Sequence, residues 1–143
     1  MNQPDIEKRV AYAHELHERG FNCAQSVAYA CADLVGLDEA TAFKTTEGLG
    51  GGMGGATETC GAISGGAVVL GYVTSDGPHN PHTKMQTYML ASQLVQQFKQ
   101  KNGSTICEEL KGLTGGPVLR SCPGCIEDAL RMTLALLEDA PRP

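Results

Sequence analysis

Apolar residues recur along this chain with the spacing of helices. In the first segment the residues Ile6, Val10, Ala13 and His17 fall three or four positions apart, which predicts a helix over Asp5–Gly20. The same spacing, with glycines where helices usually stop, predicts helices over residues 22–35 and 39–47. No segment alternates apolar and polar residues long enough to form a strand. The predicted fold class is therefore all-α.

The segment Gly48–Gly55 interrupts this pattern, because six of its eight residues are glycine. That density predicts a loop with an unusual backbone path and no regular element. A helix rich in small residues is predicted to follow from about Thr57. Within it Gly61 and Gly65 lie one helical turn apart, so another helix or a bound group can approach this backbone closely.

The second half of the chain predicts three further helices. Asn80 is expected to cap a long helix that begins at Pro81 and ends at Asn102, before Gly103. A short helix is predicted over residues 105–111 and a last one over residues 122–138. Because we find no repeat, linker or shift in composition, residues 1–143 are expected to form a single redox-active cysteine domain. Its architecture is expected to be a bundle of about six to seven helices with a glycine-rich loop.

Composition and charge exclude several functional classes. The net charge is -5 at pH 7, Lys and Arg form no cluster, and Trp is absent. A nucleic-acid partner is therefore not expected. The longest apolar stretch, Cys60–Val73, is too short to span a membrane, so no membrane partner is expected either. The first residues lack the basic and apolar regions of a signal peptide, which favours a cytoplasmic location.

Six cysteines in such a chain require an explanation. A reducing cytosol disfavours structural disulfides, so the cysteines indicate metal binding, redox cycling or catalysis. Four of them are predicted to lie in the first turn of a helix, each soon after a residue suited to N-capping. They are Cys23, Cys60, Cys107 and Cys122, after Asn22, Thr59, Thr105 and Ser121, with capping boxes at Asn22–Gln25 and Thr105–Glu108. The N–H groups and dipole of a helix N-terminus stabilise a thiolate, the form that attacks disulfides and binds iron or zinc.

The other two cysteines have different surroundings. Cys31 follows Cys23 on the same predicted helix among apolar residues and is expected in the core. Cys125 completes the CxxC sequence with Cys122, which is typical of thiol–disulfide exchange and also of half a metal site. Four glycines are expected to line a bound cofactor and to offer N–H donors to its sulfurs: Gly51, Gly52, Gly54 and Gly61.

Taken together, these segments resemble the redox-active protein family named for a C…CGAxxG…C…C signature. The matching pieces are NCAQSV at residues 22–27, the glycine-rich loop, CGAISG at 60–65, CEEL at 107–110 and CP at 122–123. Their order and spacing agree over nearly the whole chain. The resemblance implies a redox role and, by position, makes Cys23, Cys60, Cys107 and Cys122 the family's four cysteines. Cys31 and Cys125 are additions of this sequence.

Three functions remain open. The first is electron transfer or redox sensing by an iron–sulfur cluster, of the [2Fe–2S] type, on Cys23, Cys60, Cys107 and Cys122, with a redox partner protein. The second is a thiol–disulfide oxidoreductase that binds no metal, with Cys122 and Cys125 as its catalytic pair and a protein or small thiol as partner. The third is a structural zinc site with four cysteine ligands. The chain would be an enzyme if it is the oxidoreductase of the second function. Small-residue helices with an acidic surface suit a homodimer.

Overall fold

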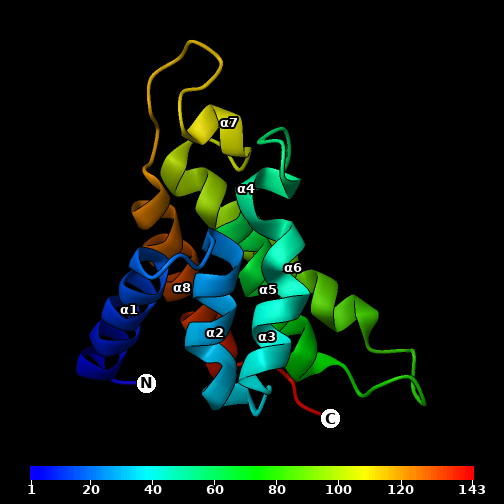
Figure 1. Cartoon of the computed structure of the whole chain (residues 1–143). Helices are drawn as coiled ribbons and strands as arrows, with labels where there is room; N and C mark the ends of the chain where they lie inside the picture. Colours follow the sequence, from blue (N-terminus) through cyan, green and yellow to red (C-terminus); the bar gives the residue numbers. More distant parts are fainter.

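Helix α5 (Gly61–Thr74) lies at the centre of the structure and packs against α2 (Cys23–Val35), α6 (Lys84–Asn102) and α8 (Cys122–Glu138), as Figure 1 shows. This is a computed structural model, and it describes residues 1–143. Helix α1 (Gln3–Glu18) packs against α2 and α8, and α3 (Glu39–Thr46) packs against α2. The only strand-like pairing is an isolated bridge between Thr59 and Ile106. The predicted all-α class is confirmed.

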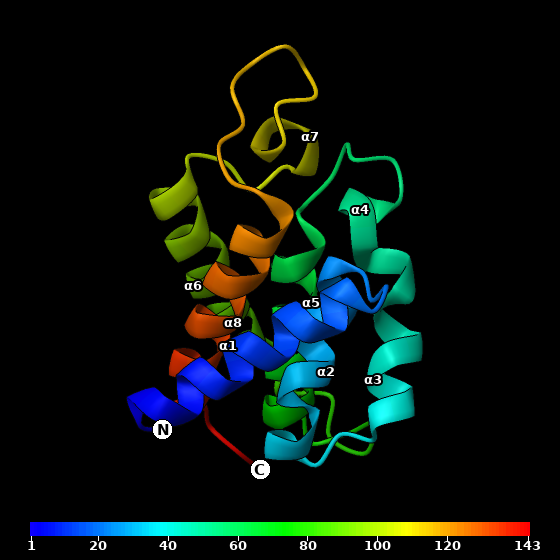
Figure 2. The ribbon, with the colours of Figure 1, turned by 60° about the vertical axis from the view of Figure 1, so that its left-hand side comes forward.

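Short elements gather at one end of this bundle. They are the 3₁₀ turn η1 (Glu47–Leu49) and the single helical turns α4 (Gly50–Met53) and α7 (Cys107–Leu110). Helices α2, α5 and α8 all begin at this end and run away from it (Figures 1 and 2). None of the helices is both long enough and apolar enough to cross a membrane.

The core consists of apolar side chains from the five longest helices. Its largest fully buried members include Leu16 of α1, Leu70 of α5, Phe98 of α6 and Leu130 of α8. The predicted stripe on α1 is largely confirmed, since Val10 and Ala13 are buried with Leu16. Burial of these side chains supplies most of the free energy that holds the helices together.

Glycines of α5 let two neighbouring helices approach its backbone. A Cβ at Gly65 would lie 2.4 Å from the carbonyl oxygen of Ala24 on α2, and one at Gly66 would lie 2.3 Å from Oγ1 of Thr133 on α8. Real Cβ atoms do not come so close to other atoms. The close approach predicted at Gly65 is confirmed.

Two predicted helix starts are wrong. Helix α6 begins at Lys84, because the Asn80 side chain is used inside the preceding loop, where its Nδ2 donates to Asp76 and its Oδ1 accepts from the backbone of His82. Pro81 therefore lies in a turn before the helix. Helix α5 begins at Gly61 and not near Thr57, because the residues before it pair with the segment before α7.

The glycine-rich segment differs from prediction in one respect. It contains the helical turn α4, although a loop without regular elements was expected. The turn is irregular, since Gly51 and Gly52 have φ values of 61° and 58°. These left-handed conformations favour glycine, which explains the composition of the segment.

We predict that Gly65→Ala destabilises the fold, because its Cβ has no space between α5 and α2. The free energy of unfolding should fall by about 1–3 kcal/mol, the usual cost of overpacking, in urea denaturation. Gly71→Ala is the matched control on the same helix, where the nearest atom to a Cβ is Thr87 Cγ2 at 3.5 Å. That variant should be neutral or gain up to about 1 kcal/mol from helix propensity. Equal stability of the two variants would contradict the close approach.

Candidate functional site

Cysteines stand at the beginning of four helices. Cys23, Cys107 and Cys122 are the first residues of α2, α7 and α8, and Cys60 is the N-cap of α5. The predicted place in the first turn is confirmed for Cys23, Cys107 and Cys122, whereas Cys60 lies one position before the first turn. Because α2, α5 and α8 begin at the end where α4 and α7 lie (Figure 2), these helix N-termini belong to one region of the molecule.

Two of the predicted caps form. Asn22 Oδ1 accepts from the backbone N–H of Gln25 at 2.9 Å, and Gln25 Oε1 accepts from the backbone N–H of Asn22 at 2.9 Å. At α8 the Ser121 hydroxyl accepts from the N–H of Gly124 at 3.1 Å. These caps fix the turns that carry Cys23 and Cys122.

The other two predicted caps are wrong. Neither Thr59 nor Thr105 caps its helix, because the N-caps are Cys60 and Ile106 and neither makes a side-chain cap hydrogen bond. The hydroxyl of Ser104 takes over before α7 and accepts from the Ile106 N–H at 3.0 Å. The segments around both threonines are extended and pair with each other, so their backbone leaves no room for a capping geometry.

This pairing brings Cys60 and Cys107 side by side in the fold. The N–H of Cys60 donates to the Thr105 carbonyl at 2.7 Å, and the N–H of Cys107 donates to the Glu58 carbonyl at 3.0 Å. Two cysteines 47 positions apart in the chain are thereby held at neighbouring helix starts.

The irregular turn α4 packs against two of the cysteines. Cys60 and burial raise the pKa of the Cys23 thiol, and the backbone N–H of Gly51 acts against them. A Cβ at Gly52 would lie 2.5 Å from Cys107 Cβ and 3.4 Å from its Sγ. Successive glycines thus contact Cys23 and Cys107, which supports their predicted place beside the cysteine site.

Gly61 lies beside a cysteine sulfur, whereas Gly54 does not. A Cβ at Gly61 would lie 2.5 Å from the Sγ of Cys23, so this glycine lets α2 and α5 bring their first residues together. Gly54 has no atom within 4 Å of its Cβ position and ends α4 at φ 88°. Its residue type is explained by this turn, and its place beside a cofactor stays a prediction.

Three thiols form a buried chain. The Cys60 thiol interacts with those of Cys125 and Cys23, and all three are 6% exposed or less. The hydrogen bond with Cys125 raises the pKa of Cys60 to about 12, while Cys23 acts in the opposite direction. The hydrogen bond with Cys60, together with burial, raises the pKa of Cys23 above its ordinary value. Cys23 and Cys60 are therefore neutral thiols at pH 7 in this arrangement.

Lys111 lies beside two more sulfurs. Its Nζ donates to Cys107 Sγ at 3.2 Å. Burial lowers the pKa of Lys111, but hydrogen bonds with Cys122 and Cys107 outweigh burial and raise it above the ordinary value. Cys107 is buried, whereas Cys122 is partly exposed. Cys107 and Cys122 thus form a second group of sulfurs, which lies beside an ammonium and has one member that solvent reaches.

The two groups of sulfurs do not form a ready metal site. No three His, Cys, Asp or Glu side chains are arranged to hold a metal ion as they stand. All six cysteines are free thiols. Cys31 is fully buried in the core as predicted, and burial raises its pKa to about 12. The histidines lie elsewhere and hydrogen-bond to no cysteine.

Sequence reasoning missed Lys111. The signal was available, because Cys107 and Lys111 are four positions apart on one predicted helix and such pairs meet on a helix surface. It also missed the surroundings of Cys125, whose Sγ donates to the Arg120 carbonyl at 3.9 Å and which raises the pKa of Cys60 on another helix.

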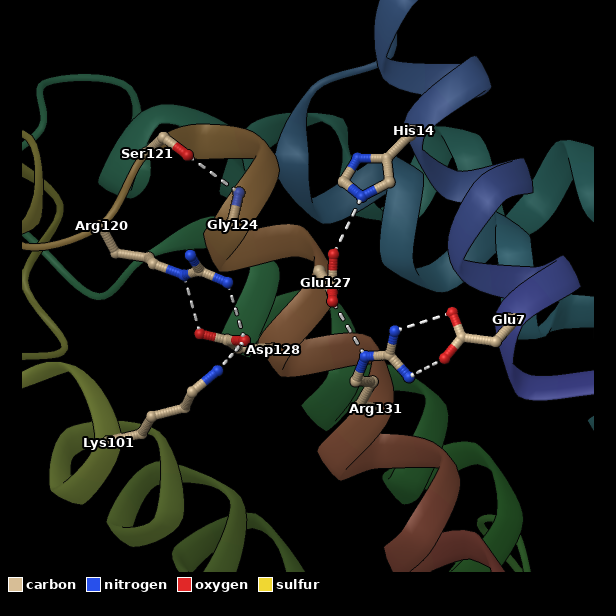
Figure 3. Close-up of polar contacts among 9 residues, drawn as sticks. All are labelled: Glu7, His14, Lys101, Arg120, Ser121, Gly124, Glu127, Asp128 and Arg131. Atoms are coloured by element: carbon tan, nitrogen blue, oxygen red, sulfur yellow. Dashed lines mark hydrogen bonds and ion pairs between the residues drawn. The ribbon is translucent and has the colours of Figure 1, made fainter. Parts of the chain in front are cut away.

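A buried carboxylate anchors the turn that carries Cys122 and Cys125. The Asp128 side chain is 1% exposed and accepts from Arg120 Nε and Nη2 at 3.0 and 3.1 Å. Lys101 Nζ from α6 also donates to Asp128 (Figure 3). Asn102 Nδ2 of the same helix donates to it at 3.1 Å. Arg120 in turn covers Gly124, where a Cβ would lie 2.4 Å from Arg120 Nε. The start of α8 is therefore tied both to the preceding loop and to α6.

The model of the family described as "Putative redox-active protein (C_GCAxxG_C_C)" matches residues 21–136. The chain belongs to this family. Neither the curated proteins nor the solved structures contain a match. The matched segment contains all six cysteines, the glycine-rich turn and Lys111. The family is described as redox-active.

We predict that Asp128→Asn lowers the free energy of unfolding at pH 7 by about 1.5–3 kcal/mol, because it removes hydrogen bonds from charged donors. Burial raises the pKa of Asp128, but Arg120, Lys101 and Asn102 outweigh it and the net pKa is lowered. The unfolded chain therefore binds this proton first as pH falls. The stabilisation is present above about pH 4 and is lost as pH falls through the lower pKa of the folded state.

Urea unfolding at pH 7 and pH 3 tests this prediction, and the difference between wild type and Asp128→Asn should be smaller at pH 3. Asp33→Asn is the control, because Asp33 forms an exposed ion pair with Arg9 and its side chain is 65% exposed. Its loss should cost less than about 1 kcal/mol. Equal losses of unfolding free energy in the two variants would contradict the stabilising role of Asp128.

Proposed function

We propose that this protein transfers single electrons through an iron–sulfur cluster, of the [2Fe–2S] type, held by Cys23, Cys60, Cys107 and Cys122. The observation that carries the proposal is the start of four helices at these four cysteines in one region of the fold. Thiolates are the usual ligands of such clusters, and four are needed. Membership of a family described as redox-active supports the proposal.

The backbone beside the cysteines suits such a group, although the sulfurs would have to move together to bind it. Backbone N–H groups of Gly51 and Ala62 favour the thiolate forms of Cys23 and Cys60, and hydrogen bonds from such groups stabilise bound clusters. The backbone packs so closely at Gly52 and Gly61 that no side chain fits beside the sulfurs. Most of the sulfur is shielded from water, which protects a cluster from hydrolysis and oxidation.

When bound, the cluster would supply one-electron chemistry, and the chain's own residues hold and insulate it. Binding requires the thiols to lose their protons and to exchange their hydrogen bonds with one another and with Lys111 for bonds to iron. Cys122 is the least buried of the four ligands, so the electron partner is expected to approach on its side.

Thiol–disulfide exchange is the second candidate, favoured by the partial exposure of Cys122 and by Cys125 one turn later on α8. The Cys122 thiolate would attack one sulfur of a substrate disulfide and release the other as a thiolate. Cys125 would then attack the mixed disulfide, which releases the second substrate sulfur and leaves a Cys122–Cys125 disulfide. Two electrons pass to the substrate, and a second thiol must reduce the protein again.

Protein purified without oxygen should contain iron and acid-labile sulfide in equal amounts, measured by elemental and colorimetric analysis. Each of the substitutions Cys23→Ser, Cys60→Ser, Cys107→Ser and Cys122→Ser should lower bound iron at least tenfold. Cys31→Ala is the matched control, since Cys31 is a core cysteine outside the site, and it should retain iron. Cys125→Ser should also retain iron.

Other results would favour the alternatives. Iron-free wild-type protein whose Cys125→Ser variant traps a mixed disulfide at Cys122, detected by mass spectrometry, would establish exchange in place of the cluster. Zinc without sulfide, lost in the same four variants, would indicate a structural metal site.

A further inference from the structure

Lys111 directs its ammonium at sulfur and not at a carboxylate. The Nζ atom is 3.2 Å from Cys107 Sγ, and none of the ion pairs in the structure includes Lys111. The side chain is partly buried. A partly buried cation without a carboxylate partner is costly unless a group close to it carries negative charge. The sulfurs beside Lys111 are the groups placed to carry that charge.

The backbone fixes this position. Lys111 N–H donates to the Cys107 carbonyl at 3.1 Å, so the same helical turn sets the places of the sulfur and the ammonium. Gly112 follows with φ 69°, and a Cβ there would lie 2.8 Å from the carbonyl oxygen of Gly116. The chain therefore turns sharply directly after Lys111.

The loop that follows returns to the same place. The Leu110 carbonyl accepts from the N–H groups of both Leu119 and Arg120, at 2.8 and 3.1 Å. These bonds tie the end of α7 to the residues just before α8. Lys111, next to Leu110, is thereby held near Cys122 as well as Cys107. The loop closure is independent of any property of the thiols and supports a fixed site for the ammonium.

We propose that Lys111 sets the reduction potential of this site by stabilising negative charge on the Cys107 and Cys122 side of it. The inference rests on the proposed redox function. Reduction of a cluster by a one-electron donor protein adds one negative charge to it, and reduction of a disulfide by a thiol generates thiolate sulfur. In both cases the fixed positive charge favours the reduced form through Coulomb attraction, which is strong where water is excluded.

The charge acts unevenly on the site. The thiols of Cys23, Cys60 and Cys125 interact with one another, and no ammonium or guanidinium group hydrogen-bonds to them. The charge of Lys111 reaches Cys23 as the smallest of the influences on its pKa. Cys107 and Cys122 therefore form the more easily reduced side. Cys122 is also the partly exposed sulfur, so the side stabilised by Lys111 is the side open to a partner.

The test compares reduction potentials of Lys111→Met and Lys111→Arg with wild type. Lys111→Met should make the equilibrium constant for reduction at least tenfold less favourable, which is a fall of 59 mV for a one-electron couple. Lys111→Arg keeps the charge and should stay close to wild type. Lys99→Met is the matched control, because Lys99 is an exposed lysine on α6 with no ion pair and its loss changes net charge equally.

Iron and sulfide content of the same preparations separates this inference from the proposed function. If wild type contains no cluster, the proposed function fails, and the potential of its thiol couple is measured against glutathione instead. Lys111→Met should also make the equilibrium constant for reduction of this thiol couple tenfold less favourable. Circular dichroism verifies folding, and Lys111→Gln replaces Lys111→Met if the latter does not fold. A potential in the neutral variant equal to wild type, or an equal fall in Lys99→Met, would overturn the role of Lys111.

Discussion

The contact between the backbones of α2 and α5 is the constraint on which the rest of the structure depends. It exists because Gly61 and Gly65 have no side chains, so that α2 can lie directly against α5. This contact brings the sulfur of Cys23 to the first turn of α5, where Cys60 is the N-cap. The remaining helices pack around this pair. A single methyl group at either glycine therefore disturbs both the core and the cysteines.

Around that contact the fold keeps two chemical environments apart. Cys23, Cys60 and Cys125 lie in a buried environment of interacting thiols. On the other side Lys111 supplies positive charge beside the buried Cys107 and the partly exposed Cys122. Asp128, held between two cations and an amide, ties the start of α8 to the preceding loop and to α6. The site is therefore polarised before any partner arrives.

Much of this was predictable from sequence because the local signals were strong. The boundaries of α8 and the capping box of Asn22 follow from neighbouring residues, and so does the start of helices at cysteines. Errors arose where a distant segment decided the outcome. Thr59 is not a cap because the segment before α5 pairs with the one before α7, and Asn80 is not a cap because Asp76 and His82 use its side chain. The place of Lys111 beside Cys122 and that of Cys125 beside Cys60 likewise depend on how distant segments pack, which local spacing does not encode.

The distribution of the site along the chain has a consequence for its biosynthesis. Its sulfurs come from residues 23 to 125, and the last two lie on the final helix. A growing chain that has not yet produced α8 contains α2 and α5 but lacks the sulfur that faces solvent and the anchor at Asp128. The complete site therefore comes into being only when the C-terminal helix docks.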